Sequence, residues 1–225
     1  MKPRLTIRVA VQLSLLHGLL VAASAWAAPA VYELDPVHTR VVFAVEHAGF
    51  SQAIGTVSGS TGRLLFDADD WSLSQVEVSV PLQRVDLGDA KWNDSVLAGN
   101  LLDVANFPTA TFVSTRIEPI DARHAAVHGD LTLHGTTREV KLDVTFNAMQ
   151  RHPLPPFRRT AGFSATTVIS RAEFGIDAWK SVIGDRVELR MEVEATRSRA
   201  DDMENRDDAP TQDAKPSLTT EPVTP

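Results

Sequence analysis

The amino-acid sequence predicts an all-β fold, an antiparallel eight-stranded barrel with one short helical insertion. Apolar and polar side chains alternate over most of residues 28–196, and a period of two indicates strands with one buried face. Turn sequences at residues 67–70 and 134–137 separate alternating runs, which is typical of antiparallel neighbours. Residues 89–105 break this period, and they predict the helix.

Each predicted strand contains apolar residues at alternate positions, and about eight such runs can be distinguished. In chain order they are Val41, Phe43 and Val45; Leu64 and Phe66; Val76, Val78 and Val80; Ala110 and Phe112; Val127, Leu131 and Leu133; Val140, Leu142, Val144 and Phe146; Phe163, Ala165 and Ile169; and Val187, Leu189, Met191, Val193 and Ala195. The last run is the clearest, because charged residues fill most of the positions between its apolar ones.

The predicted helix is too small to cover the apolar face of the sheet. Trp92, Val96 and Leu101 recur at roughly helical spacing, and residues 106–108 end the run. A sheet with one apolar face must cover it, so we expect this sheet to fold on itself. Closure into a barrel also removes exposed sheet edges, although alternation alone does not exclude a two-sheet sandwich.

Both ends of the chain differ in composition from the middle. Residues 1–27 have a basic start, an apolar stretch and a small-x-small pattern at residues 25–27, which predicts a cleaved signal peptide and a periplasmic destination. Residues 197–225 contain no aromatic residue, and their composition predicts a disordered acidic tail. The barrel domain is therefore expected to span residues 28–196.

Composition excludes several classes of function. The formal net charge of -7 and the absence of a Lys/Arg-rich block argue against nucleic acid as a partner. The chain has no cysteine, which excludes disulfides, thiolate metal sites and a cysteine nucleophile.

Small residues share the predicted inner face with phenylalanines, which favours a hollow interior. These small residues are Ala110, Ser114, Gly129, Ala165 and Thr167. An eight-stranded barrel can enclose one slender guest, and each buried methylene of a lipid would contribute about 0.8 kcal/mol. The alternative is a filled core in which small residues lie opposite large ones.

The predicted pocket is lined mainly by apolar side chains of the strands. The candidate ligand-binding residues are Phe43, Val45, His47, Phe66, Val78, Phe112, Leu131, Phe163, Ala165, Ile169, Phe174 and Trp179. His47 ends an apolar stripe and is a candidate for contact with a lipid head group. Phe174 and Trp179 fall in a loop, where they either line the pocket entrance or plug the barrel end.

No catalytic or metal-binding residue is predicted. His124 and His128 lie in an extended region, where a spacing of four does not bring two ligands together as it does on a helix. Ser164 lacks the second glycine of a nucleophile elbow. Structural roles are expected for three polar residues near strand ends: His38, Arg171 and Asp185.

An ordered set of short motifs links the chain to a known family. The motifs lie at residues 32–47, 62–67, 107–114, 129–135, 171–175 and 184–187. Together they resemble the YceI-like family of bacterial exported proteins over about residues 31–196. The resemblance implies a lipocalin-like barrel, usually periplasmic, whose elongated pocket holds a polyisoprenoid such as a ubiquinone tail. Residues 92–102 lack the arginine- and histidine-bearing pattern common in relatives, which leaves the head-group preference open.

The sequence therefore predicts a periplasmic binding or carrier protein for a long apolar lipid, either a polyisoprenoid or an isoprenoid quinone. No catalytic cofactor is expected, and the expected partner is the lipid itself. Transient contact with a membrane and a homodimer are left open. One alternative is a structural or stress-response barrel without ligand. The other is an enzyme acting on an isoprenoid quinone, which requires an acid–base pair that the sequence does not show.

Overall fold

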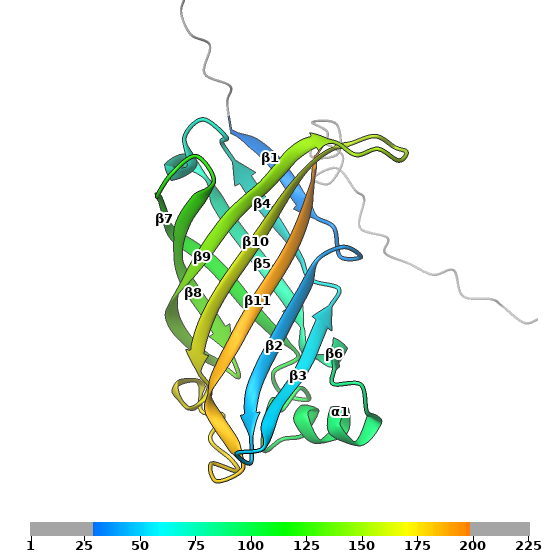
Figure 1. Cartoon of the computed structure of the whole chain (residues 1–225), viewed down its shortest axis with the longest axis vertical. Helices are drawn as coiled ribbons and strands as arrows, with labels where there is room; N and C mark the ends of the chain where they lie inside the picture. The colour runs from blue at the N-terminus through cyan, green and yellow to red at the C-terminus, as the bar shows by residue number, and fades with distance from the viewer. Residues whose placement is uncertain (1–28, 199–225) are drawn as a thin grey trace, which may run out of the picture.

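The computed structural model describes residues 29–198, which form a single closed sheet (Figure 1). Its strands are β1 (Ala30–Leu34), β2 (Arg40–His47), β3 (Ser51–Ser58), β4 (Thr61–Phe66), β5 (Gln75–Pro81), β6 (Val85–Asp86), β7 (Thr109–Pro119), β8 (His124–Leu133), β9 (Thr136–Arg151), β10 (Arg159–Ser170) and β11 (Ile183–Arg197). Its helices are α1 (Ala90–Leu97) and the short 3-10 segments η1 (Trp71–Leu73), η2 (Leu82–Arg84) and η3 (Arg171–Phe174).

The sheet closes into a barrel through its first and last strands. The strand order is β1-β4-β5-β7-β8-β9-β10-β11, and β11 also pairs with β1, so these strands form a ring. Strands β2, β3 and β6 extend the ring from β11. The pairings are antiparallel, which confirms the predicted eight-stranded antiparallel barrel over the two-sheet sandwich.

The extra strands arise because parts of the wall are interrupted along their length. Strand β11 pairs with β2 over most of its length and with β1 near its end, so β1 and β2 are two halves of one wall strand. In the same way, β3 pairs with β2 while β4 pairs with β1. Strand β3 was not predicted, because its inward residues include Ala53 and Gly55, which are small, and Ile54 faces outward.

The helical insertion is shorter than residues 89–105. Asp89 caps α1 by accepting hydrogen bonds from the backbone N–H groups of Lys91 and Trp92, and Ala98 leaves the helix with extended backbone. Turns follow, in which the carbonyl of Ala98 accepts hydrogen bonds from the N–H groups of Leu101 and Asp103. No helix within residues 29–198 is long and apolar enough to cross a membrane.

The predicted terminal segments fall largely outside the described residues. The predicted signal peptide, residues 1–27, lies wholly outside them, as does the predicted acidic tail from residue 199 onward. Arg197, taken as the first residue of that tail, instead ends β11 and pairs with Tyr32.

A hydrogen-bonded turn shapes the break between β1 and β2. One carboxylate oxygen of Asp35 accepts the backbone N–H groups of Val37 and His38, and the other lies 2.8 Å from Nδ1 of His38. Desolvation opposes ionisation of Asp35, but these hydrogen bonds hold its pKa below the usual value. The hydrogen bond and the charge of Asp35 raise the pKa of His38. His38 thus orients a turn, as predicted.

The stability contributed by this turn is expected to depend on pH. Because the pKa of His38 is raised on folding, its contribution is fully present below its ordinary value of about 6.5 and is lost as pH rises through the folded value. Asp35, whose pKa is lowered, loses its contribution only as pH falls through its folded value. We therefore expect His38→Gln to unfold at lower urea than the wild type near about pH 5, and the difference to shrink near about pH 9.

Urea unfolding of both proteins at the two pH values tests this expectation. His152→Gln is the matched control, because His152 is another partly exposed histidine that bonds only its own loop, through Leu154. A His38→Gln deficit of equal size at both pH values would contradict it.

Aromatic side chains close one end of the barrel. The Phe66 ring lies with its centroid 5.6 Å from Trp71, 5.5 Å from Phe146 and 5.2 Å from Phe163. Tyr32 adds an edge contact to Phe66 at 6.4 Å. Edge-on aromatic packing of this kind buries large apolar area and is rigid, so this end is sealed.

Candidate functional site

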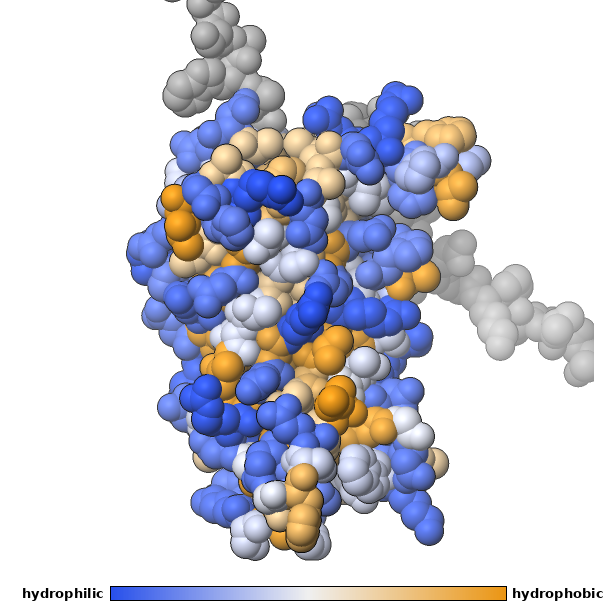
Figure 2. Space-filling view, in the orientation of Figure 1, coloured by the Kyte–Doolittle hydropathy of each residue, from blue (hydrophilic) through white to orange (hydrophobic). Residues whose placement is uncertain are grey.

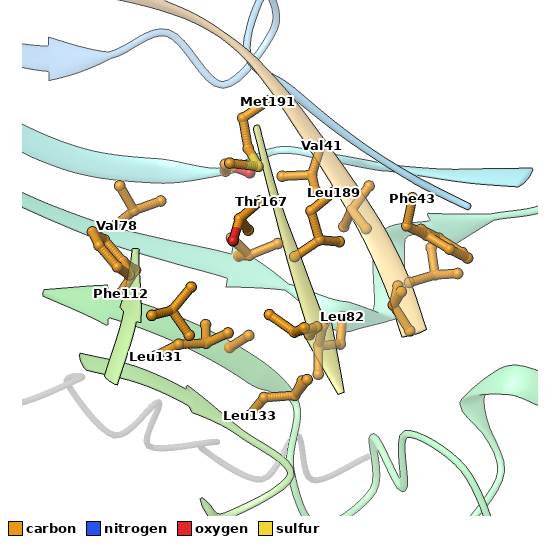
Figure 3. Close-up of a pocket in the computed structure, with 18 of the residues that line it drawn as sticks. Val41, Phe43, Val78, Leu82, Phe112, Leu131, Leu133, Thr167, Leu189 and Met191 are labelled. Carbon is orange, nitrogen blue, oxygen red and sulfur yellow. The ribbon is translucent and has the colours of Figure 1, made fainter. Parts of the chain in front are cut away.

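A cavity of about 790 Å³ occupies the barrel interior. This volume falls within the range of roughly 300–1,000 Å³ that is usual for small-molecule sites. Side chains of β2 and β11, including Val41, Leu189 and Met191, face Val78 and Phe112 across a common interior (Figure 3). The lining is almost entirely hydrocarbon, so the cavity suits an apolar guest.

The structure brings together nearly all of the predicted site residues. Those that line the cavity are Phe43, Val45, His47, Phe66, Val78, Phe112, Leu131, Phe163, Ala165, Ile169 and Trp179. They come from β2, β4, β5, β7, β8 and β10 and from the loop before β11. Alternation identified those on the strands, because every second side chain of a barrel strand faces inward, whereas Trp179 was proposed from its place in a loop. Their contact with a lipid stays a prediction.

The assignment of Phe174 to the pocket is wrong. Its side chain is 1% exposed and packs with Val140, Ile169 and Ile176 in a separate cluster. Phe174 ends η3, and Gly175 follows in the left-handed conformation, so the chain turns there. The ring does not line the cavity but packs against residues that do, among them Ile169 and Leu189, so it serves as packing, the alternative that the sequence left open. Strand alternation does not extend into such a turn.

Glycines in the wall allow two phenylalanine rings to lie against it. A Cβ on Gly55 would collide with the ring of Phe43, and a Cβ on Gly129 would collide with the ring of Phe112. The ring of Phe43 therefore covers the backbone at Gly55, and the ring of Phe112 covers it at Gly129. Gly129 was expected to add free volume, but Phe112 occupies that space, and Ser114 accepts a hydrogen bond from the N–H of Val76 at 2.9 Å. Neither Gly129 nor Ser114 lines the cavity.

The cavity reaches the surface at the end that carries α1. Its lining there includes Trp92, whose side chain is 44% exposed, and Trp179, which is 59% exposed. The ring of His47 lies 5.5 Å from that of Trp92. At the opposite end the lining residues Phe66 and Trp71 are buried. We call the open end the mouth, defined by His47, Trp92 and Trp179.

A buried arginine holds the loop at the mouth. Arg171 is 6% exposed, and its guanidinium donates to the carbonyl oxygens of Gly184, Ile176, Ala178 and Ile183 at 2.7–2.9 Å. These bonds join η3, the loop and the start of β11. The predicted structural role of Arg171 is therefore correct, although no pattern in the sequence indicated that it shapes the mouth.

Asp185, near the start of β11, also joins η3 to that strand. Its carboxylate accepts the backbone N–H of Ala172 at 3.0 Å. Hydrogen bonds from the Ser170 side chain and from that N–H lower the pKa of Asp185. The carboxylate is therefore ionised at neutral pH and serves as a backbone acceptor.

The remaining candidates for chemistry lie on the outer surface. His124 contacts Asp121, and His128 contacts Glu118. Residues 29–198 contain no group of three or more His, Cys, Asp or Glu residues that could hold a metal ion. Ser164 donates to the carboxylate of Glu192 at 2.6 Å, which lowers the pKa of Glu192. The Ser164 hydroxyl thus has a hydrogen-bond acceptor, the Glu192 carboxylate, on the outer surface of the neighbouring strand.

Several cavity residues were not predicted as site residues. They include Val41, Val57, Leu82, Val85, Leu133, Leu189 and Met191. The alternation in β2, β8 and β11 already indicated Val41, Leu133, Leu189 and Met191 as inward-facing. Val57 lies in β3, whose other inward residues are Ala53 and Gly55. Leu82 and Val85 lie in η2 and in the two-residue strand β6, which are too short to show a period.

The sequence was compared with known protein families and proteins. The YceI-like domain family matches residues 32–195. A UPF0312 protein of Pseudomonas savastanoi pv. phaseolicola is 34% identical over 164 residues, which cover 73% of this chain and 84% of the relative. A UPF0312 protein of Pseudomonas putida is 30% identical over 187 residues, which cover 83% of this chain and 96% of the relative.

Solved structures share the fold. Burkholderia cenocepacia BcnA has a TM-score of 0.65 at 24% identity, covering 72% of this chain and 99% of BcnA. A polyisoprenoid binding domain from Saccharophagus degradans has a TM-score of 0.55 at 15% identity, covering 76% of this chain and 99% of that domain. The family match runs from β1 to β11 and so includes the whole barrel with its cavity. This chain belongs to the YceI-like family.

Proposed function

We propose that this protein binds a long apolar lipid, a polyisoprenoid or an isoprenoid quinone, inside its barrel and carries it in the periplasm. The observation that carries the proposal is the cavity of about 790 Å³, which lies in a closed barrel and is lined almost entirely by hydrocarbon. The description of a structural neighbour as a polyisoprenoid binding domain supports the ligand class. The signal-peptide pattern of residues 1–27 supports the compartment.

The physical chemistry of the lumen favours a hydrocarbon over water. Water in a cavity needs two to four polar partners, and this lining offers few. A flexible chain gains about 0.8 kcal/mol for each buried methylene, before the entropy of ordering it is subtracted. Affinity should therefore increase with chain length until the cavity is full.

Native mass spectrometry of protein purified from its host tests the proposal. We expect a species heavier than the mature chain by the mass of a lipid, and lipid extraction should identify that species as an isoprenoid. A single species at the calculated chain mass would favour the alternative of a barrel without ligand.

Among the lining residues, the titratable side chains are Glu46, His47 and Arg171, and all lie at the mouth. The guanidinium of Arg171 already donates hydrogen bonds to backbone carbonyl groups. A binding role therefore accounts for the interior better than catalysis does. Turnover of a quinone analogue that is abolished in His47→Ala would favour the enzyme instead.

We further propose that the mouth contacts a membrane when lipid is exchanged. Phe50 at the β2–β3 turn is 91% exposed, and Trp92 and Trp179 at the mouth are 44% and 59% exposed. The turn is tied to the loop before β11, because the N–H of Ala48 donates to the carbonyl of Val182 at 2.6 Å. A small hydrophobic patch lies among hydrophilic residues at the lower tip of the molecule, where this turn lies (Figure 2).

Aromatic side chains of this kind favour the interface between lipid head groups and acyl chains. A bilayer is also the natural source of a water-insoluble cargo. Contact at the mouth would let the lipid pass between membrane and barrel without crossing water.

The double variant Phe50→Ser/Trp179→Ser is expected to bind phosphatidylcholine vesicles about ten-fold more weakly than the wild type, because it loses the apolar area that enters the interface. Vesicle co-sedimentation measures the bound fraction. Ile120→Ser is the matched control, because Ile120 is 67% exposed but lies in the β7–β8 turn at the sealed end. Equal losses in both variants would contradict a specific role for the mouth.

A further inference from the structure

Two wall strands break at the same level of the barrel, and each break places a hydroxyl group in the wall of the cavity. The break between β1 and β2 ends at Thr39, and the break between β3 and β4 contains Ser60. The breaks are adjacent, because the N–H of Gly59 donates to the carbonyl of Pro36 at 3.2 Å. Thr39 is 2% exposed and Ser60 is 0% exposed, and both line the cavity.

The hydroxyl of Ser60 differs from its neighbours in having no partner. Thr39 donates its hydroxyl to the carbonyl of Glu194 at 3.3 Å. Ser74, another lining residue, accepts the N–H of Asp67 at 3.0 Å. Ser60 Oγ has no hydrogen-bond partner among residues 29–198. A buried hydroxyl without a partner is costly, so this one marks a position where a ligand atom can complete the bond.

The surroundings of Ser60 restrict the chemistry of that ligand atom. The wall nearby is apolar, since Val41 pairs with Val57 just before the break and Leu64 follows in β4. The charged lining residues Glu46 and Arg171 lie away from this level, at the mouth. Arg84 lies against Gly59, but it is exposed, donates to Ser58 and does not line the cavity. A phosphate or carboxylate would therefore be buried at this level without a counter-charge in the lining, whereas a hydroxyl or carbonyl would need only one hydrogen bond.

We propose, resting on the proposed function, that the lipid carries a neutral oxygen, as a hydroxyl or a carbonyl, that hydrogen bonds to Ser60 Oγ. The polar end of the cargo then lies inside the barrel instead of at the mouth beside His47 and Trp92. The protein selects an uncharged isoprenoid alcohol or ketone over a phosphorylated isoprenoid.

Competition for a fluorescent occupant tests this proposal. The full exported chain is loaded with N-phenyl-1-naphthylamine, which is displaced by geranylgeraniol, by the hydrocarbon in which hydrogen replaces its hydroxyl, or by geranylgeranyl phosphate. Ser60→Ala is expected to weaken geranylgeraniol binding about five-fold, because it removes one neutral hydrogen bond, and to leave the hydrocarbon unchanged. Geranylgeranyl phosphate should bind the wild type at least about ten-fold more weakly than the alcohol.

A hydroxyl on the outer face of the barrel provides the matched control. Ser164 lies on β10, donates its hydroxyl to Glu192 and does not line the cavity. Ser164→Ala is expected to leave the affinity for geranylgeraniol within about two-fold of the wild type. Thr167 presents a second hydroxyl to the cavity (Figure 3), and a five-fold loss in Thr167→Val with none in Ser60→Ala would overturn the assignment to Ser60.

Thermal unfolding of the unloaded proteins adds an independent readout. Ser60→Ala removes a buried hydroxyl without a partner, so its Tm should equal or exceed that of the wild type. A lower Tm would indicate a structural bond and count against the proposal. If Ser60→Ala does not fold, Ser60→Cys keeps the shape with a weaker donor and is expected to lose affinity for the alcohol alone.

The outcomes separate this inference from the proposed function. If neither geranylgeraniol nor its hydrocarbon displaces the fluorescent occupant, the lipid-binding function itself fails. If both bind and Ser60→Ala changes neither affinity, the lipid-binding function stands and the hydrogen bond to Ser60 is wrong.

Discussion

Ala165→Trp is expected to weaken lipid binding by about 50-fold, because an indole at this position fills space that the lipid needs. Ala165 lies on β10 between Val144 and Met191 of the neighbouring strands, and it lines the cavity. If the indole displaces about three methylene groups, the loss is roughly 2.4 kcal/mol. The cavity has room for the ring, so we expect stability to fall by less than about 1 kcal/mol. Lipid uptake should therefore decrease far more than stability.

The neighbouring residue provides the control for this prediction. Thr166 is exposed on the outer face of the same strand, so Thr166→Trp adds the same ring outside the barrel. Competition binding and urea unfolding on both variants give the comparison. Wild-type uptake by Ala165→Trp would show that the lipid does not occupy the lumen beside β10.

Arg171→Ala is expected to cause the largest loss of stability among single substitutions at the mouth. The change leaves the carbonyl oxygens of Gly184, Ile176, Ala178 and Ile183 without their donor. Hydrogen bonds to a charged group contribute about 1.5–3 kcal/mol each, and water can replace some of them at the rim, so we expect a loss of about 3–4 kcal/mol. The corresponding decrease in Tm is about 10 °C.

Two further variants show whether the geometry of Arg171 matters. Arg171→Lys keeps the charge but cannot reach four carbonyl groups, so most of the loss should remain. Arg186→Ala, an exposed arginine on β11, should change stability by no more than about 0.5 kcal/mol. Full recovery of stability in Arg171→Lys would mean that charge alone, without the planar fork of donors, holds the loop.

Alternation of apolar and polar residues was enough to predict most of the barrel. Strands β2, β4, β5 and β7 to β11 each have one face toward the lumen, so their side chains repeat with a period of two. Alternation did not predict β1, β3 or β6. Strands β1 and β6 have only five and two residues, too few to show a period. The inward face of β3 includes Ala53 and Gly55, while its larger residue Ile54 faces outward.

The predicted site residues likewise divide into those that strand alternation placed correctly and those that it did not. Residues within long strands, such as Phe43 and Ala165, line the cavity as expected, because the pleat dictates which way they face. Phe174 does not, because it ends a 3-10 turn. Gly129 was counted as free space, although the ring of Phe112 on the adjacent strand covers it. The size of a cavity depends on such neighbours across strands.

The order of residues along single segments was enough to predict the fold class, the inward face of each long strand and the apolar character of the interior. The folded chain was needed to show which end opens, how Arg171 holds the mouth and that the hydroxyl of Ser60 has no partner among residues 29–198. These features depend on contacts between different segments, such as η3 with β11, or the β1–β2 break with the β3–β4 break. Strand pairing and loop packing bring such segments together, and alternation within one strand carries no record of these contacts.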